Sequence, residues 1–155
     1  MSQFKIQKHK QKVDLKLKGA ETLSGYFFLN AQGASHEGPD RVLDMLQASP
    51  GFVPFETHAH EFWMVNTEAI ESVVVDSVYE LEVIRSFGDD YYIFKEVLVQ
   101  FVPGHCAKGN LVIEPQEGFK RVQDELNRGK RFVILDCGDR THLIATSHVA
   151  TVVEV

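Results

Sequence analysis

Apolar and polar residues alternate in two short segments of the chain, V-D-L-K-L at 13–17 and V-L-V-Q-F at 97–101. In both segments the first, third and fifth residues are apolar, a period that is typical of a strand with one buried face. A turn with glycine follows each segment, and further apolar runs come at 25–29 and 109–113. We therefore predict that each segment begins a β-hairpin.

A short helix is predicted after each hairpin, over residues 40–47 and 119–127. In the first, Val42 and Leu46 are four residues apart and therefore share one face of a helix, and the second has the same spacing. Asp40 precedes the first helix and is a residue type that caps helix N-termini.

Three apolar runs follow each helix and are predicted to be strands. They lie at 52–55, 62–65 and 69–75 in the first part of the chain, and at 132–135, 142–145 and 149–155 in the second. The predicted order in each part is therefore strand, strand, helix, strand, strand, strand.

The same residue types recur in the same order in the two parts, which indicates an internal duplication. Placing Val13 over Val97 aligns the two hairpins without a gap, and Gly25 then falls on Gly109. The loop that follows is four residues longer in the first copy.

A second block aligns the rest of the two copies. R-V-L-D-M-L-Q at 41–47 falls on R-V-Q-D-E-L-N at 121–127, and the block then runs without a gap to its end. This alignment places Val73 over Val153 and Val75 over Val155.

The duplication divides the chain into four parts. These are a basic N-terminal arm or edge strand at 1–12, module copy 1 at 13–75, a linker rich in strand at 76–96 and module copy 2 at 97–155.

A module of about sixty residues forms only a marginal core alone. Short and evenly spaced strands are typical of small, partly closed barrels of the SH3 or Sm-like kind. We therefore expect a mainly β fold with two short helices, in which two barrel-like modules pack as a pseudo-twofold pair. Alternation at Tyr79, Leu81 and Val83, and then at Tyr91 and Ile93, predicts that the linker is largely strand.

The helix motif R-V-x-D-x-L-(Q/N), followed by Phe-Val, resembles the R-L-S-D-x-L-N-like motif of a class of small uncharacterised bacterial β-rich domains. Both copies carry it, so the resemblance covers most of the chain. The chain departs from the pattern at Leu43 and Gln123, where the class has Ser, and at Gln47, where it has Asn. The resemblance supports the module boundaries and implies no activity.

The composition is that of a soluble globular protein, with 44% apolar and 25% charged residues in a chain of 155. No apolar run approaches the ~20 residues that span a bilayer, and the Lys-rich start is not a secretory signal. Cys106 and Cys137 have no metal-ligand spacing and are expected to be free thiols. We therefore expect a cytoplasmic protein without membrane contact.

The formal net charge of −6 is unevenly spread, because residues 1–12 carry four Lys and no acidic residue. This basic segment is either an arm for an acidic partner or a solvated strand whose Lys residues prevent pairing at its edge. The second interpretation is favoured because the run is short.

The densest group of possible metal ligands is E-T-H-A-H-E at 56–61. The two imidazoles of His58 and His60 share one side of an extended chain, which is one way to begin a zinc or iron site. The third and fourth ligands would have to come from Glu56, Glu61, His36 or Glu37. The second copy keeps neither histidine of this turn. An exposed polar turn is therefore favoured, with no metal or other cofactor.

Arg and Asp stand three residues apart in both helices, as Arg41 with Asp44 and Arg121 with Asp124. Residues with this spacing are neighbours on a helix, so each pair is expected to form an ion pair with a structural role. The alternative is that these residues orient the helix or meet across the two copies.

Five cations gather near the second helix: Lys120, Arg121, Arg128, Lys130 and Arg131. If they converged, they could bind phosphate, and an Sm-like barrel would make RNA a natural partner. No aromatic residue outside the expected core is interleaved with them, so this nucleic-acid function is kept as an alternative.

No catalytic motif is present: neither a nucleophile arrangement nor a phosphate-binding or dinucleotide-binding glycine pattern occurs. We therefore predict a non-enzymatic binding or adaptor protein that acts through protein–protein contacts or self-association.

The first copy is the richer of the two in aromatic residues and has the longer loop, so it is the predicted contact region. Its candidate partner-binding residues are His36, Glu37, His58, His60 and Trp63.

Overall fold

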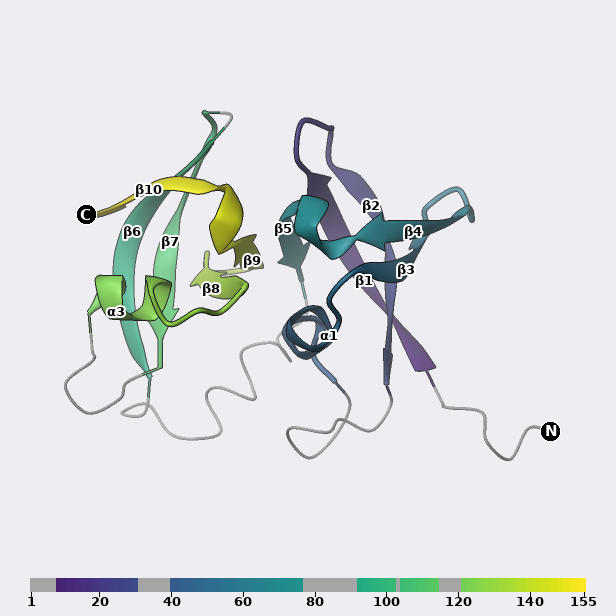
Figure 1. Ribbon diagram of the computed structural model, residues 1–155, viewed down its shortest axis with the longest axis horizontal. Helices are drawn as coiled ribbons and strands as arrows, with labels where there is room; N and C mark the ends of the chain where they lie inside the picture. The colour runs from purple at the N-terminus through teal and green to yellow at the C-terminus, as the bar shows by residue number, and fades with distance from the viewer. Residues whose placement is uncertain (1–7, 31–39, 77–91, 103, 115–120) are drawn as a thin grey trace.

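The computed structural model describes residues 8–30, 40–76, 92–102, 104–114 and 121–155. These residues form a mainly β protein in which ten strands make one antiparallel sheet, with two short α-helices (Figure 1). No described helix is long and apolar enough to cross a membrane.

The predicted order of elements is confirmed in both halves of the chain. The first half contains β1 (Lys8–Leu17), β2 (Leu23–Asn30), α1 (Val42–Ala48), β3 (Phe52–Thr57), β4 (Phe62–Asn66) and β5 (Ile70–Val75). The second contains β6 (Ile93–Phe101), β7 (Cys106–Ile113), α3 (Val122–Leu126), β8 (Phe132–Asp136), β9 (Thr141–Ala145) and β10 (Val149–Glu154). A 3₁₀ turn precedes the last strand of each half, at Thr67–Ala69 and Thr146–His148.

Two of the predicted boundaries lie inside strands. Lys8–Lys12 of the basic segment belong to β1 and pair with β2, and β5 runs beside β1 only from Asp14. β6 begins at Ile93, within the predicted linker. The rest of the alternating pattern of the linker lies at 77–91, outside the described residues.

The two halves have the same strand order and are joined into one sheet. The order is β5-β1-β2-β3-β4 in the first half and β10-β6-β7-β8-β9 in the second, and β9 pairs with β5. The ends of the sheet are therefore β4 and β10, which lie at opposite ends of the molecule (Figure 1).

The expectation of two small, partly closed barrel-like modules is wrong, because the ten strands form one sheet that is not closed into a barrel. Closing either half would require its first and last strands in the sheet order to pair, as β5 with β4. The outer edge of β5 is instead occupied by β9 of the other half, and β4 and β10 keep an edge free of the described strands.

The expected pseudo-twofold is also wrong. A twofold axis would repeat every contact between the halves, so pairing of β9 with β5 would require pairing of β4 with β10. These two strands end the sheet and do not pair. The halves therefore meet head to tail, through two strands that are not equivalent.

The hydrophobic core consists of two clusters, and the first spans both halves. Its main part comes from the first half, but the second half adds residues from β7, β8 and β9: Val112, Phe132, Ile134, Leu143 and Ala145. The second cluster contains residues of the second half alone. The first half therefore does not complete its own core.

Strand pairing corrects the predicted alignment of the two copies by one residue. Val53 pairs with Val65 whereas Val133 pairs with Ile144, so the β3–β4 hairpin is one residue longer than the β8–β9 hairpin. As a consequence, Val152 and not Val153 is the counterpart of Val73. The predicted alignment of the second block without a gap is therefore wrong. The turn of the β8–β9 hairpin is one residue shorter, and the sequences of the two turns do not reveal this difference.

The glycines that coincide in the two copies are required by a close approach of neighbouring strands. A Cβ at Gly25 would meet the carbonyl oxygen of Glu56 and the ring of Phe55. A Cβ at Gly109 would lie 2.8 Å from the carbonyl oxygen of Asp136. Any side chain at either position would force β3 or β8 to move.

Gly25→Ala and Gly109→Ala are each expected to lower the free energy of unfolding by about 1–3 kcal/mol, because the added methyl group overpacks a strand crossing. Urea unfolding at equilibrium measures this change. Lys108→Ala, at an exposed residue beside Gly109, is the control and should stay within about 0.5 kcal/mol of the wild type. Equal effects of the three changes would contradict the close-approach interpretation.

Candidate functional site at the free edge of β4

The β3–β4 hairpin presents an apolar face to solvent at one end of the sheet. Pro54 pairs with Met64 and Glu56 with Phe62, so alternate residues of the two strands share a face. On this outer face, the exposed fractions are 63% for Phe52, 70% for Phe62 and 63% for Met64.

The opposite face of the hairpin is buried. Val53, Phe55 and Val65 pack in the first core cluster. The hairpin is therefore apolar on both faces although only one of them contacts the core. Scattered exposed apolar residues are normal on a protein surface, but a contiguous group of them marks a contact surface.

A third aromatic residue, Phe28 of β2, joins this exposed group. The ring of Phe28 stacks on the ring of Phe62, with centroids 6.2 Å apart and an interplanar angle of 18°. We call the group of Phe28, Phe52, Pro54, Phe62 and Met64 the outer patch.

The outer patch lies beside an unpaired strand edge. Among the described strands β4 pairs only with β3, so the backbone N–H and C=O groups along its other edge are open to a further strand. Trp63, which is 37% exposed, lies on the buried face of this strand. An apolar surface and a row of backbone hydrogen-bonding groups are thus combined at one place.

A buried carboxylate lies next to the patch, at the start of the 57–61 turn. Glu56 is 5% exposed, with Lys10 Nζ 2.6 Å from its Oε1 and His60 Nδ1 3.5 Å from its Oε2. The pKa of Glu56 is lowered, mainly by its hydrogen bond with the Lys10 ammonium group, although burial acts in the opposite direction. Lys10 also lies over the ring of Tyr26, 5.6 Å from its centroid.

The two histidines of this turn are exposed. The side chain of His60 is 81% exposed, and its Nδ1 contacts the carboxylate of Glu56. The backbone of His60 has a φ of 65°. Within the described residues, no three His, Cys, Asp or Glu side chains are placed to hold a metal ion. The other candidate ligands and contact residues, His36 and Glu37, lie outside the described residues.

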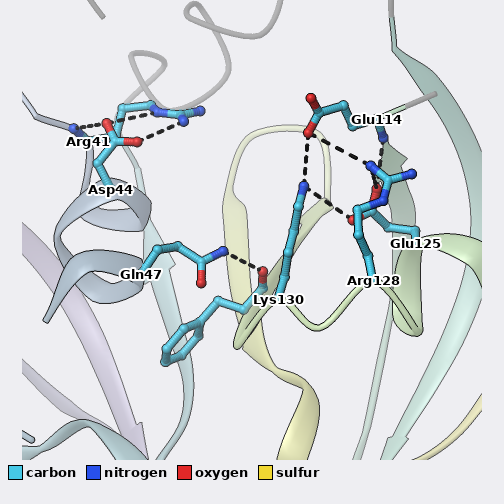
Figure 2. Close-up of polar contacts among 8 residues, drawn as sticks. Arg41, Asp44, Gln47, Glu114, Glu125, Arg128 and Lys130 are labelled. Carbon is cyan, nitrogen blue, oxygen red and sulfur yellow. Dashed lines mark hydrogen bonds and ion pairs between the residues drawn. The ribbon is translucent and has the colours of Figure 1, made fainter. Parts of the chain in front are cut away.

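The Arg-x-x-Asp motif forms the predicted i,i+3 ion pair in both helices. Asp44 Oδ2 accepts the backbone N–H of Arg41 at 2.9 Å, and Arg41 Nη2 lies 2.9 Å from Asp44 Oδ1 (Figure 2). In the second helix, Asp124 Oδ2 accepts the Arg121 N–H at 3.0 Å and the Nε–H at 3.3 Å. The Arg121 backbone N–H is the main cause that the pKa of Asp124 is lowered.

This motif therefore begins each helix. The aspartate reaches back to the first N–H group that the helix leaves unsatisfied, which explains why Arg and Asp recur together at this spacing.

The cations near α3 do not converge on one surface. Lys130 Nζ lies 3.0 Å from Glu114 Oε2, and Arg128 Nη1 lies 3.4 Å from Glu125 Oε1. Figure 2 shows both side chains directed at these two carboxylates. Glu125 is 2% exposed and also accepts the backbone N–H of Glu114 at 2.8 Å.

The remaining cations of this group are dispersed. Arg131 Nη2 donates to Thr67 Oγ1 at 2.8 Å, across the boundary between the halves. Arg121 is paired with Asp124, and Lys120 lies outside the described residues.

A hollow of about 520 Å³ lies where the two halves meet. Lys18, Thr67, Arg131, Thr146 and His148 are among the residues that line it. Two of its polar side chains are already engaged across the boundary, because Arg131 donates to Thr67 and His148 Nε2 lies 2.9 Å from the carbonyl oxygen of Glu68. The hollow is therefore better explained as part of the junction than as a ligand site.

The sequence did not indicate that a buried carboxylate lies at this junction. Glu71 of β5 is fully buried, with His105 Nε2 3.1 Å from its Oε1 and Lys16 Nζ 3.4 Å from its Oε2. The indication of Glu71 in the sequence is that it is a single acidic residue within the apolar run 69–75. Lys16 lies near the end of β1 and His105 lies in the turn between β6 and β7, so Glu71 ties β5 to both of these segments.

The sequence also did not single out Phe52, Phe62 and Met64 as contact residues, although it did single out Trp63. The available signal was the uninterrupted apolar run F-W-M-V at 62–65, where a strand with one solvated face would alternate.

Comparison with protein-family models, with curated proteins and with solved structures found no match. The resemblance of the helix motif to small bacterial domains therefore identifies no family. The fold and the site stand on the geometry of this chain.

Glu56→Gln is expected to lower stability at neutral pH and to change its dependence on acid. Because the pKa of Glu56 is lowered by folding, its contribution is complete above the ordinary value of 4.5 and is lost as the pH falls through the folded value. The difference in unfolding free energy between wild type and variant should therefore shrink as the pH is lowered below 4.5.

Urea unfolding at a series of pH values tests this dependence. Glu96→Gln is the control, since Glu96 forms an exposed ion pair, 3.3 Å from Lys108, that is expected to contribute little. A difference between Glu56→Gln and the wild type that stays constant from neutral to acid pH would contradict the role of the Glu56 charge.

Proposed function

We propose that this protein is a non-enzymatic binding or adaptor protein that holds an extended segment of a protein partner at the β4 edge. The observation that carries the proposal is the position of the outer patch. Phe52, Phe62 and Met64 are each more than 60% exposed and lie beside an unpaired strand. A monomer gains nothing from this arrangement, which exposes apolar area and an open edge together.

Strand addition is the mode of recognition that fits this surface. A partner strand would extend the sheet through backbone hydrogen bonds to β4, and alternate side chains of the partner would pack on the outer patch. Lys10 and Glu56 lie at the polar rim of the patch. Backbone pairing supplies affinity, and the apolar contacts select the partner.

The nucleic-acid alternative has weaker support from the structure. Arg128 and Lys130 face Glu114 and Glu125, so a phosphate group would have to compete with carboxylates already in contact. The metal alternative at 56–61 is supported by two exposed histidines, of which His60 contacts the carboxylate of Glu56.

Met64→Lys is expected to weaken binding of an extended apolar peptide by at least about tenfold, because it places a charge in the middle of the patch. The peptides would be selected from a displayed random library panned on the wild-type protein. Binding is read from the fluorescence of Trp63, the single Trp of the chain, which lies on β4.

Val102→Lys is the matched control, because Val102 is an equally exposed apolar residue, at 57%, in the second half. It should leave peptide binding unchanged. Selected peptides that bind wild type and Met64→Lys with equal affinity would refute the proposed site.

A further inference from the structure

The junction inside the chain shows how the outer face of a β-hairpin is covered in this fold. β5 pairs with β9 in a defined register, with Val73 opposite Leu143 and Val74 opposite His142. The outer face of the β8–β9 hairpin is then buried in the core of the first half. The Gln47 side chain adds a hydrogen bond to this contact, because it donates to the Phe132 carbonyl oxygen at 3.1 Å (Figure 2).

The outer patch of the first half occupies the same positions as this covered face. Strand register makes Met64 the counterpart of Leu143 and Pro54 the counterpart of Ile134. Leu143 is fully buried and Ile134 is 7% exposed, whereas Met64 is 63% exposed. The same surface of the module is thus covered in one half and bare in the other.

The second half lacks the corresponding cover at its own end. Ile70, Val73 and Leu46 of the first half, which pack at the junction, are fully buried. By register and by alignment, their counterparts in the second half are Val149, Val152 and Leu126. All three counterparts are only partly buried at the margin of the second core cluster.

We propose that the partner at the β4 edge is a second copy of this chain, which contributes its β10 edge and α3. This inference rests on the proposed function, since it uses the same site. The contact repeats the β5–β9 junction between molecules, so the internal register transfers directly. Val152 of one molecule lies opposite Met64 of the next, and Val153 lies opposite Trp63.

The contact between molecules is weaker than the internal junction. Asn66 takes the place of the buried Ala145, and Glu154 takes the place of the fully buried Val75. The internal junction also has an ion pair, with Arg140 Nη1 3.4 Å from Asp14 Oδ2, and the counterpart of Asp14 in the second half is Leu98. Association is therefore reversible and depends on concentration.

The contact uses two different surfaces and so leaves a free end on each molecule. Such head-to-tail contacts produce rings where the rotation closes and open chains where it does not. In both forms, every filled contact has one outer patch and one β10 edge.

Sedimentation of the purified full chain tests the association. Between about 5 µM and about 500 µM the weight-average mass should at least double from the 17.5 kDa of one chain. Met64→Lys should remain at the mass of one chain throughout. Phe94→Lys also introduces a lysine, at a residue of β6 that is 39% exposed, and this variant should associate as the wild type does.

Disulfide cross-linking tests the register. In a background with the free Cys106 and Cys137 replaced by Ala, Met64→Cys protein is mixed with Val152→Cys protein and oxidised. A cross-linked heterodimer is expected because the two residues are directly opposite in the transferred register. Ala150→Cys, two residues along the same strand, is the control and should give at least fivefold less heterodimer.

The outcomes separate this inference from the proposed function. Association that is abolished by Met64→Lys, with cross-linking specific to residues 64 and 152, supports the inference. Peptide binding at the patch without self-association, or association without the specific cross-link, overturns the inference and leaves the proposed function standing. If Met64→Lys changes neither self-association nor peptide binding, the inference and the proposed function are both overturned.

Discussion

Strands β5 and β9 pair across the boundary between the two halves, and the rest of the architecture depends on this pairing. It occupies the edge through which the first half would otherwise close on itself. It brings the β8–β9 hairpin over the first core cluster, which takes Phe132, Ile134 and Leu143 from the second half. Because the pairing joins non-equivalent strands, it also leaves β4 and β10 unpaired at the ends of the sheet.

The free ends differ in chemistry although the halves share their order of elements. At the first end, an apolar hairpin face carries Phe52, Phe62 and Met64. At the second, the side chains of α3 and β10 are partly covered, and Val153 remains 55% exposed. The two ends of the sheet therefore present different surfaces.

The sequence was sufficient for the order of elements, because period-two alternation and the V-x-x-x-L spacing are local properties. It was insufficient for barrel closure and for the symmetry of the halves. Whether β5 pairs with β4 or with β9 depends on competition between strand edges that are distant in the chain. The sequence pattern around Val73 predicts a buried strand residue in either case.

The same limit applies to the site. The sequence pointed to the first copy, and Trp63 does lie on the free strand, but its pattern does not say which face of a hairpin another element covers. Phe132 and Phe52 are equivalent in sequence, yet one is 1% and the other 63% exposed. Their difference arises only when the second half packs on the first.

The composition of the first core cluster has a consequence for biosynthesis. Val13 and Leu15 belong to the same core cluster as Leu143 and Ala145. The last residues of this cluster are therefore synthesised more than a hundred residues after the first. Domains that fold during synthesis usually do so from the N-terminus onward. In this chain the half that is made first acquires its complete core only after the other half has been translated.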